Sequence, residues 1–309
     1  MIIVRDAGDL YEVGPGAPTL EGAVLLHYLD GFIDAGAAGR LLTAHLLGSL
    51  EHEAVVTFDV DRLIDYRSRR PPMTFEKDRW AEYEDPEIAI HLVKDQAGTP
   101  FLLLTGPEPD HEWERFISAV STVSSRLGAE LVIRFHGIPM GVPHTRPLGV
   151  TAHGTKPELV AGSRPIVDRL QVPGSAASLL EFRLGGQGKA AVGFAVHVPH
   201  YLAQAAYPAA AVALLDYVCK VSGLSLPTET LREAAQRTDE EIARQVESSE
   251  EITELVQALE RQYDAVVEAA EHPDLLAEQL SNMPTAEELG AQFERFLAEQ
   301  QGHPDPPEN

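Results

Sequence analysis

Several groups of side chains in this sequence could do chemistry, and the first lies in a turn after the apolar run 23–29. Asp30, Gly31, Asp34 and Gly36 occupy this turn, and an alanine-rich segment follows it. A strand that runs into a helix through a glycine turn places small ligands at the carboxyl end of an α/β sheet. A dinucleotide site would need glycine at position 34, because an aspartate there repels a pyrophosphate. We therefore expect a tight turn with a capping aspartate, and this turn is the first place to look for a ligand.

The second group consists of histidines at or near the ends of predicted strands. His144 and Arg146 stand in Val142-Pro-His-Thr-Arg-Pro147, and His200 follows the apolar run 192–198. A base next to a guanidinium could bind an anion or transfer a proton. No histidine pair has the helical spacing of a metal site, and no carboxylate partner can be assigned. The sequence predicts structural histidines, with no metal and no cofactor.

Three arginines form a third group in Arg67-Ser-Arg69-Arg70-Pro-Pro. Guanidinium groups suit carboxylates and phosphates, so these arginines could clamp an oxyanion. They could equally pair with acidic residues of a neighbouring subunit, and both interpretations stay open. The segment Gly185-Gly-Gln-Gly-Lys189 superficially matches a phosphate loop, but Ala190 stands where that motif has a hydroxyl residue. We expect a flexible turn there.

The elements that position these residues alternate between apolar runs and helical patterns. Continuous apolar runs predict strands that are covered on both faces, at 23–29, 54–60, 101–104, 131–135 and 192–198. The spacing after Asp110 predicts a crossover helix that ends near Gly128, and Pro208 suits the first turn of a second helix over 209–221. Residues 61–90 read as an ordered insertion in which Trp80 is a core residue. The fold class is α/β, a three-layer α/β/α sandwich with a mostly parallel or mixed sheet.

Pro227 marks a predicted boundary between a domain over 1–227 and an acidic helical region over 228–301, with a disordered tail over 302–309. A heptad seam runs from Leu231 to Ala270. It forms either one long helix or a hairpin in which Ser248 and Glu251 make a capping box, and we favour the hairpin or kinked form. Another amphipathic helix is expected after Pro284. The seam residues expected at an interface are Ile252, Val256, Leu259 and Tyr263.

The composition excludes several classes of partner. The chain has 309 residues and a formal charge of −24, which is concentrated after Pro227. Such a surface repels phosphate backbones and anionic lipids, so neither nucleic acid nor a membrane is expected as a partner. Its single cysteine cannot form an internal disulfide, and the sequence shows no secretory signal and no bilayer-spanning run. We expect a cytoplasmic protein.

Motifs spread over most of the chain resemble the bacterial branch of the proteasome assembly chaperone family. They include Gly31-Phe-Ile-Asp-Ala-Gly36, Asp65-Tyr-Arg-Ser-Arg-Arg-Pro71, Val142-Pro-His-Thr-Arg-Pro147, Val172-Pro-Gly-Ser175 and His197-Val-Pro-His-Tyr201. The resemblance implies a sandwich like that of the phosphorylase and nucleosidase enzymes. It also implies homo-oligomers, as trimers or larger assemblies, and proteasome subunits as partners. It supplies no catalytic residue.

Two functions follow from these observations. The first is a non-catalytic assembly chaperone or scaffold that acts through protein contacts, because no coherent catalytic constellation stands in the sequence. The alternative is a small-molecule-binding protein or enzyme of the nucleoside phosphorylase or hydrolase type, using the crevice at the strand ends. The sequence favours the non-catalytic function.

Overall fold

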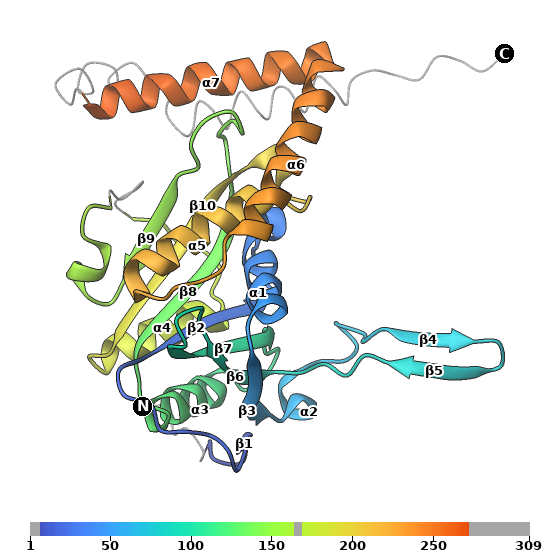
Figure 1. Ribbon diagram of the computed structural model, residues 1–309, viewed down its shortest axis with the longest axis vertical. Helices are drawn as coiled ribbons and strands as arrows, with labels where there is room; N and C mark the ends of the chain where they lie inside the picture. Colours follow the sequence, from blue (N-terminus) through green and yellow to red (C-terminus); the bar gives the residue numbers. More distant parts are fainter. Residues whose placement is uncertain (1–6, 164–168, 272–309) are drawn as a thin grey trace. The chain divides into compact units, whose positions relative to one another are not determined.

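The computed structural model describes residues 7–163 and 169–271. They fall into two compact units that divide between Val256 and Gln257. The first unit is built on an eight-stranded sheet in the order β1-β3-β6-β7-β2-β8-β10-β9 (Figure 1). Its strands are β1 (Tyr11–Val13), β2 (Ala23–Asp30), β3 (His52–Phe58), β6 (Ala89–Lys94), β7 (Pro100–Pro107), β8 (Ala129–Met140), β9 (Val150–Gly154) and β10 (Ala190–Pro199).

The predicted mixed sheet is confirmed. Its centre is parallel, because β2 pairs in parallel with β7 and β8, and β8 pairs in parallel with β10. Antiparallel strands complete both sides, through the pairs β1·β3, β3·β6, β6·β7 and β10·β9. All five strands expected from the apolar runs are present. The carboxyl ends of the four central strands therefore meet at one edge of the sheet.

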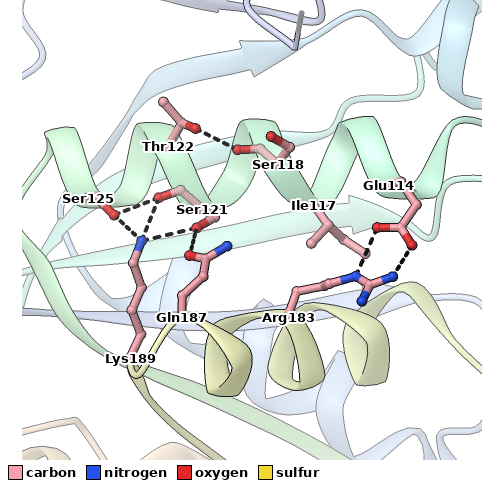
Figure 2. A pocket seen from close by; sticks show the side chains of 9 residues that line it. All are labelled: Glu114, Ile117, Ser118, Ser121, Thr122, Ser125, Arg183, Gln187 and Lys189. Carbon is pink, nitrogen blue, oxygen red and sulfur yellow. Dashed lines mark hydrogen bonds and ion pairs between the residues drawn. The ribbon is translucent and has the colours of Figure 1, made fainter. Parts of the chain in front are cut away.

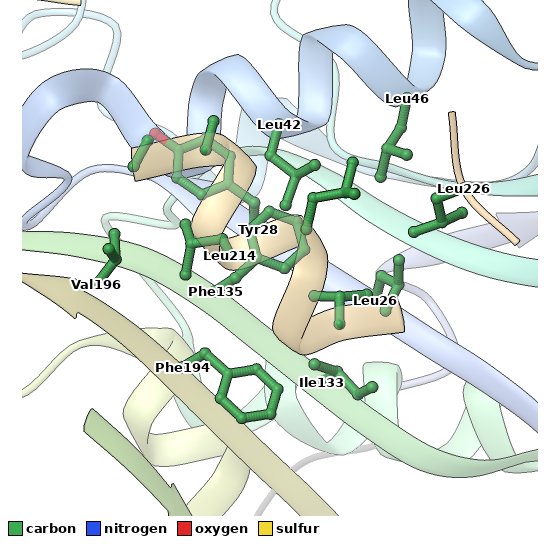
Figure 3. Close-up of a cluster of buried hydrophobic side chains, with 14 of the residues drawn as sticks. Leu26, Tyr28, Leu42, Leu46, Ile133, Phe135, Phe194, Val196, Leu214 and Leu226 are labelled. Carbon is green, nitrogen blue, oxygen red and sulfur yellow. The ribbon is translucent and has the colours of Figure 1, made fainter. Parts of the chain in front are cut away.

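Strand β2 shows why continuous apolar runs predicted strands buried on both faces. Successive side chains of a strand point to opposite faces. Leu26 and Tyr28 join the cluster beneath α1 (Ala38–Ser49) and α5 (Pro208–Ser222), with Leu42 and Leu214 (Figure 3). Leu25 joins a second cluster on the other face, beneath α3 (Trp113–Arg126) and α4 (Ala176–Gly186). The result is the predicted three-layer α/β/α sandwich.

The two helices predicted with defined ends are confirmed as α3 and α5, and Pro208 is the first residue of α5. Glu112 directly precedes α3. Asp110 lies two residues further upstream, and its Oδ2 accepts the backbone N–H of Asp65 at 2.8 Å. The shorter helices are α2 (Val60–Leu63), η1 (Ala35–Ala37), η2 (Pro157–Val160) and η3 (His200–Leu202). None of the helices in the described part of the chain is long and apolar enough to span a bilayer.

The insertion over 61–90 is ordered, as predicted, and forms a hairpin of β4 (Met73–Glu76) and β5 (Arg79–Tyr83). The prediction that Trp80 is a core residue is wrong, because its exposed fraction is 63%. Figure 1 shows the reason: the hairpin extends away from the sandwich, so none of the helices and sheets that the structure describes covers it. By contrast, Phe116 on α3 is fully buried.

The seam after Pro227 forms two helices, α6 (Glu229–Glu247) and α7 (Glu250–Glu271), so the broken form was the correct alternative. The capping residue is Ser249 rather than Ser248: Ser249 Oγ accepts the N–H of Ile252 at 3.4 Å, whereas Ser248 Oγ donates to Gln245 O. Leu231 on α6 packs into the same core as α5. The boundary at Pro227 stays a prediction, and the helix expected after Pro284 and the tail lie outside the described residues.

Candidate functional site

The turn after β2 lines a hollow of about 210 Å³ at the carboxyl end of the sheet, with Asp30, Gly31 and Arg40 among its walls. Asp34 also lines it, but its carboxylate is already engaged. Oδ1 accepts the N–H groups of Gly39 at 2.8 Å and Gly137 at 2.9 Å, and Oδ2 accepts the N–H of Arg40 at 3.0 Å. Asp34 therefore caps α1 and ties it to β8, which is the structural role expected from the sequence.

Gly36 lies deeper and belongs to the turn itself. Its φ of +68° is a left-handed conformation that favours glycine. Its N–H donates to Ala203 O at 2.9 Å, and its carbonyl accepts the N–H of Tyr207 at 2.8 Å. Because Gly36 is buried with both backbone groups paired, it holds the turn against the segment after β10 and does not face the hollow.

His144 and His200 come together around Tyr201, at a different place from the hollow. His144 Nδ1 lies 2.7 Å from Tyr201 Oη, and the His200 and Tyr201 rings lie 5.5 Å apart, edge to face. Arg146 is half-buried in the same loop as His144, and its Nη1 donates to Thr145 O at 3.4 Å. The described walls of the hollow at Asp30 include none of these three residues. The structure thus separates the predicted crevice residues into two groups.

Arg69 ties the strand-end loops together. Its Nη1 donates to Asp30 O at 3.0 Å and to Glu108 O at 2.9 Å, and its Nη2 lies 3.4 Å from Asp110 Oδ1. The guanidinium thus joins two other loops of its own chain, the one after β2 and the one after β7, and a role of Arg69 as an oxyanion clamp or at an interface stays a prediction. Arg67 and Arg70 are exposed, and their role as an oxyanion clamp or an interface stays a prediction.

The seam residues predicted at an interface differ in exposure. Ile252 has an exposed fraction of 39%, whereas Val256 and Leu259 have 4% and 8%. Tyr263 is half-buried. An interface role for these four residues stays a prediction.

A polar row beneath α4, of which His27 is buried and Arg134 and His153 are half-buried, was missed as a site. Arg134 on β8 pairs in register with His27 on β2 and with Gly193 on β10, and Gly193 pairs with His153 on β9. A Cβ at position 193 would lie 2.1 Å from His153 Cε1, so only glycine leaves room for the histidine ring. Register therefore places two histidines and one arginine in a row across four strands, facing α4.

Helix α4 supplies partners for this row. His153 Nδ1 lies 2.9 Å from Glu181 Oε1, and Arg134 Nη1 donates to Ser178 Oγ at 2.7 Å. Glu181 Oε2 and the Nδ1 atoms of His27 and His136 have no hydrogen-bond partner within the described residues. Such buried, unpaired polar atoms mark a candidate site.

Burial controls the protonation of this cluster. It lowers the pKa of His27 to about 3 and the pKa of His136 well below its ordinary value, and the charge of Arg134 adds to both shifts. Burial also lowers the pKa of Arg134. Both histidines are therefore neutral at pH 7, and each ring can act as a hydrogen-bond acceptor as well as a donor.

The space beside the cluster is small. A hollow of about 10 Å³ is lined by Glu108, Arg134 and His136, which is room for one water molecule at most. Glu108 closes it, because its Oε1 accepts the N–H of Ala176 at the start of α4 at 2.6 Å. The residues described form no group of three potential ligands around a metal position. As it stands, the cluster could hold one small polar group but not a substrate.

The start of α4 gives a first prediction. Ser175 is almost fully buried, and its Oγ accepts the N–H of Ser178 at 3.1 Å. Replacing Ser175 by alanine should lower the free energy of unfolding by about 1 kcal/mol, measured by urea denaturation. Thr228→Ala is the matched control, because Thr228 precedes α6 without a side-chain hydrogen bond to the helix. Equal losses in the two variants would contradict the capping role of Ser175.

The three-layer sandwich, with candidate sites at the ends of its parallel strands, defines an α/β protein. Comparison of the sequence with family profiles gives its family. The PAC2 family profile matches residues 28–246. The chain therefore belongs to the PAC2 family, in agreement with the resemblance to proteasome assembly chaperones. A comparison with curated proteins finds no match.

Solved structures agree with this assignment. A Mycobacterium tuberculosis protein of unknown function is 48% identical with a TM-score of 0.83, over 89% of this chain and 95% of its own. A Corynebacterium glutamicum protein of unknown function is 39% identical with a TM-score of 0.80, over 84% and 98%. A Mycobacterium tuberculosis proteasome-assembly chaperone homologue is 26% identical with a TM-score of 0.69, over 75% and 99%.

Proposed function

We propose that this chain is a protein-binding member of the PAC2 family, a non-catalytic assembly chaperone or scaffold that acts in the cytoplasm. The observation that carries the proposal is the β4–β5 hairpin. Met73, Phe75, Trp80 and Tyr83 have exposed fractions of 49%, 56%, 63% and 44%. Exposed apolar side chains gathered on one element mark a surface that binds another protein.

The register of the hairpin places these four side chains on one face. Met73 pairs with Tyr83, and Phe75 pairs with Trp80 across the strands. The Phe75 and Trp80 rings lie 5.1 Å apart, edge to face. The alternate pair is polar, since Thr74 Oγ1 donates to Glu82 Oε2 at 3.1 Å. The hairpin thus has an apolar face and a polar face, which suits one-sided docking on a partner.

Two-stranded sheets are marginally stable alone, and within residues 7–163 and 169–271 no other strand pairs with this hairpin. Burial against a partner would stabilise it, and aromatic residues commonly dominate binding energy at interfaces. Proteasome subunits are the first partners to test, because a relative that is 26% identical is described as a proteasome-assembly chaperone homologue. Further copies of this chain, in a trimer or larger homo-oligomer, are the second.

The test compares the intact chain with a Phe75→Ser, Trp80→Ser double variant. Both side chains are exposed, so the melting temperature should change little, whereas binding to purified proteasome α subunits of the same organism should weaken at least tenfold. Surface plasmon resonance measures the affinity, and light scattering measures the oligomer. Lys77→Ser at the exposed tip is the matched control. If the intact chain does not bind the α subunits at micromolar concentrations, the proteasome part of the proposal is wrong.

A second candidate function has its own observation. The unpaired atoms of His27, His136 and Glu181 are buried, and His136 lines the hollow of about 10 Å³ beside Glu108, which could admit a small polar ligand if Glu108 moved away from α4. This supports the alternative of a small-molecule-binding protein or enzyme of the nucleoside phosphorylase or hydrolase type. Thermal-shift measurements with nucleosides and phosphate test it, because a ligand that binds only the folded state raises the melting temperature. An unchanged melting temperature with every nucleoside would remove this candidate.

A further inference from the structure

A second and larger hollow lies between α3 and α4, next to the first residue of β10, and none of the roles above uses it. Its volume is about 570 Å³, within the range of about 300 to 1,000 Å³ typical of small-molecule sites. Figure 2 shows Ser121 and Ser125 on α3 facing Gln187 and Lys189, with Arg183 and Glu114 at the far end.

Lys189 carries the unusual feature of this hollow. Its ammonium donates to Ser121 O at 3.2 Å, to Ser121 Oγ at 3.0 Å, and to Ser125 Oγ. No carboxylate of residues 7–163 or 169–271 makes an ion pair with it. Neutral oxygens thus hold the ammonium without neutralising its charge, and partial burial lowers the pKa of Lys189.

The other cation of the hollow differs, because it is already neutralised. Arg183 Nε donates to Glu114 Oε2 at 3.0 Å, and Arg183 Nη2 bonds the other oxygen of the same carboxylate. This two-pronged pair occupies the planar fork with which an arginine would bind a carboxylate. In a chain of net charge −24, Lys189 is therefore the positive charge that this hollow offers to a ligand.

The glycine turn before Lys189 presents its side chain and does not itself cradle an anion. The backbone N–H groups of Gln187 and Lys189 donate to Leu184 O, and that of Gly188 donates to Gly185 O. These amides complete the end of α4, so they cannot point at a phosphate as the amides of a phosphate loop do. Of the segment Gly185-Gly-Gln-Gly-Lys189, only the ammonium of Lys189 is therefore available to an anion, and it lies beside the hydroxyl groups of α3.

We propose that this hollow binds a small ligand through a phosphate group, with Lys189, Ser121 and Ser125 as its donors. An ammonium and two hydroxyl groups approach one point from two elements, which suits a tetrahedral oxyanion better than a planar carboxylate. Ser121 Oγ now donates to Gln187 Oε1, and Ser125 Oγ donates to Ser121 O. Hydroxyl groups rotate, so both can turn to donate to the phosphate, and the ammonium of Lys189 exchanges one of its three bonds to serine oxygens for a bond to a phosphate oxygen. Ile117 lines the space between Lys189 and Arg183, where it can contact the body of a phosphorylated metabolite.

Isothermal titration of the full chain with inorganic phosphate tests the site, with acetate at the same ionic strength as a separate arm. We expect saturable binding of one phosphate per chain, at least tenfold weaker in Lys189→Gln. Lys220→Gln is the matched control, because it removes the same charge from an exposed position at the end of α5, and its affinity should equal that of the unaltered chain. Ser125→Ala, at an exposed position where folding is not at risk, should weaken binding about threefold.

Several outcomes would overturn the site. The intact chain could show no saturable binding of phosphate, or acetate could bind as tightly as phosphate. Equal weakening in Lys189→Gln and Lys220→Gln would mean that net charge governs the binding, and not this hollow. Should Lys189→Gln fail to fold, Ser125→Ala decides, since an unchanged affinity in that variant excludes the hydroxyl groups of α3 as donors.

Discussion

Replacing Asp34 by alanine is expected to lower the free energy of unfolding by about 3 kcal/mol, measured by urea denaturation. One carboxylate accepts three backbone N–H groups, from Gly39, Arg40 and Gly137. Gly39 and Gly137 are buried, so the variant would leave two N–H groups without a partner and without water. The loss should exceed that of an ordinary helix cap, because the same side chain also joins α1 to β8.

Asp30→Ala is the matched control. It removes the same charge from the same turn, but Asp30 is exposed, and within the described part of the chain its carboxylate accepts only the hydroxyl of Tyr28, at 3.2 Å. Its cost should stay within about 0.5 kcal/mol. If the two variants lose equal stability, Asp34 is not the structural element that its contacts indicate, and a role in the hollow at Asp30 becomes the better explanation.

The turn that contains Asp34 shows which features of the fold could be predicted from the sequence. An aspartate between glycines, after a strand buried on both faces, specifies a capped turn through local chemistry alone, and the structure has it. The same holds for Pro208 at the start of α5 and for the break in the seam near Ser249. Each depends on residues a few positions apart, so sequence patterns contain the necessary information.

The sequence could not predict two features, the polar row at Arg134 and the exposure of Trp80. The first depends on strand register, and the second depends on a hairpin that extends away from the sandwich. The partner of His153 is Glu181, 28 positions away on α4, and the row with Arg134 exists only because β9, β10, β8 and β2 align at those residues. One signal was available: Arg134 and His136 are alternate residues of an otherwise apolar run, and therefore share a face. Trp80 was misplaced for the opposite reason. An aromatic residue in a strand pattern is usually buried, and nothing local shows that its hairpin leaves the sandwich.

The surroundings of Lys189 could be predicted from the sequence only in part. The motif around it correctly predicted a turn instead of a phosphate loop, since the backbone amides end α4. The hydroxyl groups that surround its ammonium come from α3, more than 60 positions earlier. Only the packing of α4 on α3 makes the hollow, so the sequence alone could not place an anion there.

The stability of the protein should fall steeply as the pH drops from 6.5 to about 4.5. Burial lowers the pKa of His27 from 6.5 to about 3, and it also lowers the pKa values of His91, His136 and His197. Between those pH values the unfolded chain binds protons that the native state excludes, so acid favours unfolding. Each such histidine contributes a slope of up to about 1.4 kcal/mol per pH unit. His27 alone should remove about 2 to 3 kcal/mol by pH 4.5.

Three carboxyl groups also change the stability of the protein at acid pH, two by adding to its loss at low pH and one by opposing it. Hydrogen bonds lower the pKa values of Asp95 and Glu114 from 3.8 and 4.5, so their stabilisation is lost as the pH falls from these unfolded values through the lower native values. Burial raises the pKa of Asp239, so this carboxyl binds a proton more readily in the native state and opposes the loss. A variant that removes one histidine separates its contribution from these terms, which are common to both proteins.

His27→Leu is that variant. The Nδ1 of His27 has no hydrogen-bond partner among the described residues, and its side chain is 1% exposed, so a leucine of similar volume should change the stability at pH 7 by less than about 1.5 kcal/mol. Between pH 6 and 4.5 the slope of the unfolding free energy against pH should decrease by about 1.4 kcal/mol per pH unit, which corresponds to one proton fewer bound on unfolding. Urea denaturation at each pH measures this slope. Burial is the main reason that His27 stays neutral, and the charge of Arg134 adds to the lowering of its pKa.

His111→Gln provides the control for the loss of a histidine side chain, because His111 is exposed before α3, and the two variants are compared at each pH. A slope that is identical in the unaltered chain and in His27→Leu would show that His27 takes up a proton in the native state. That result would require a counter-charge or water beside the buried row. The row would then be an open polar site beneath the crevice, and the small-molecule function would gain the support that a closed, neutral cluster does not give it.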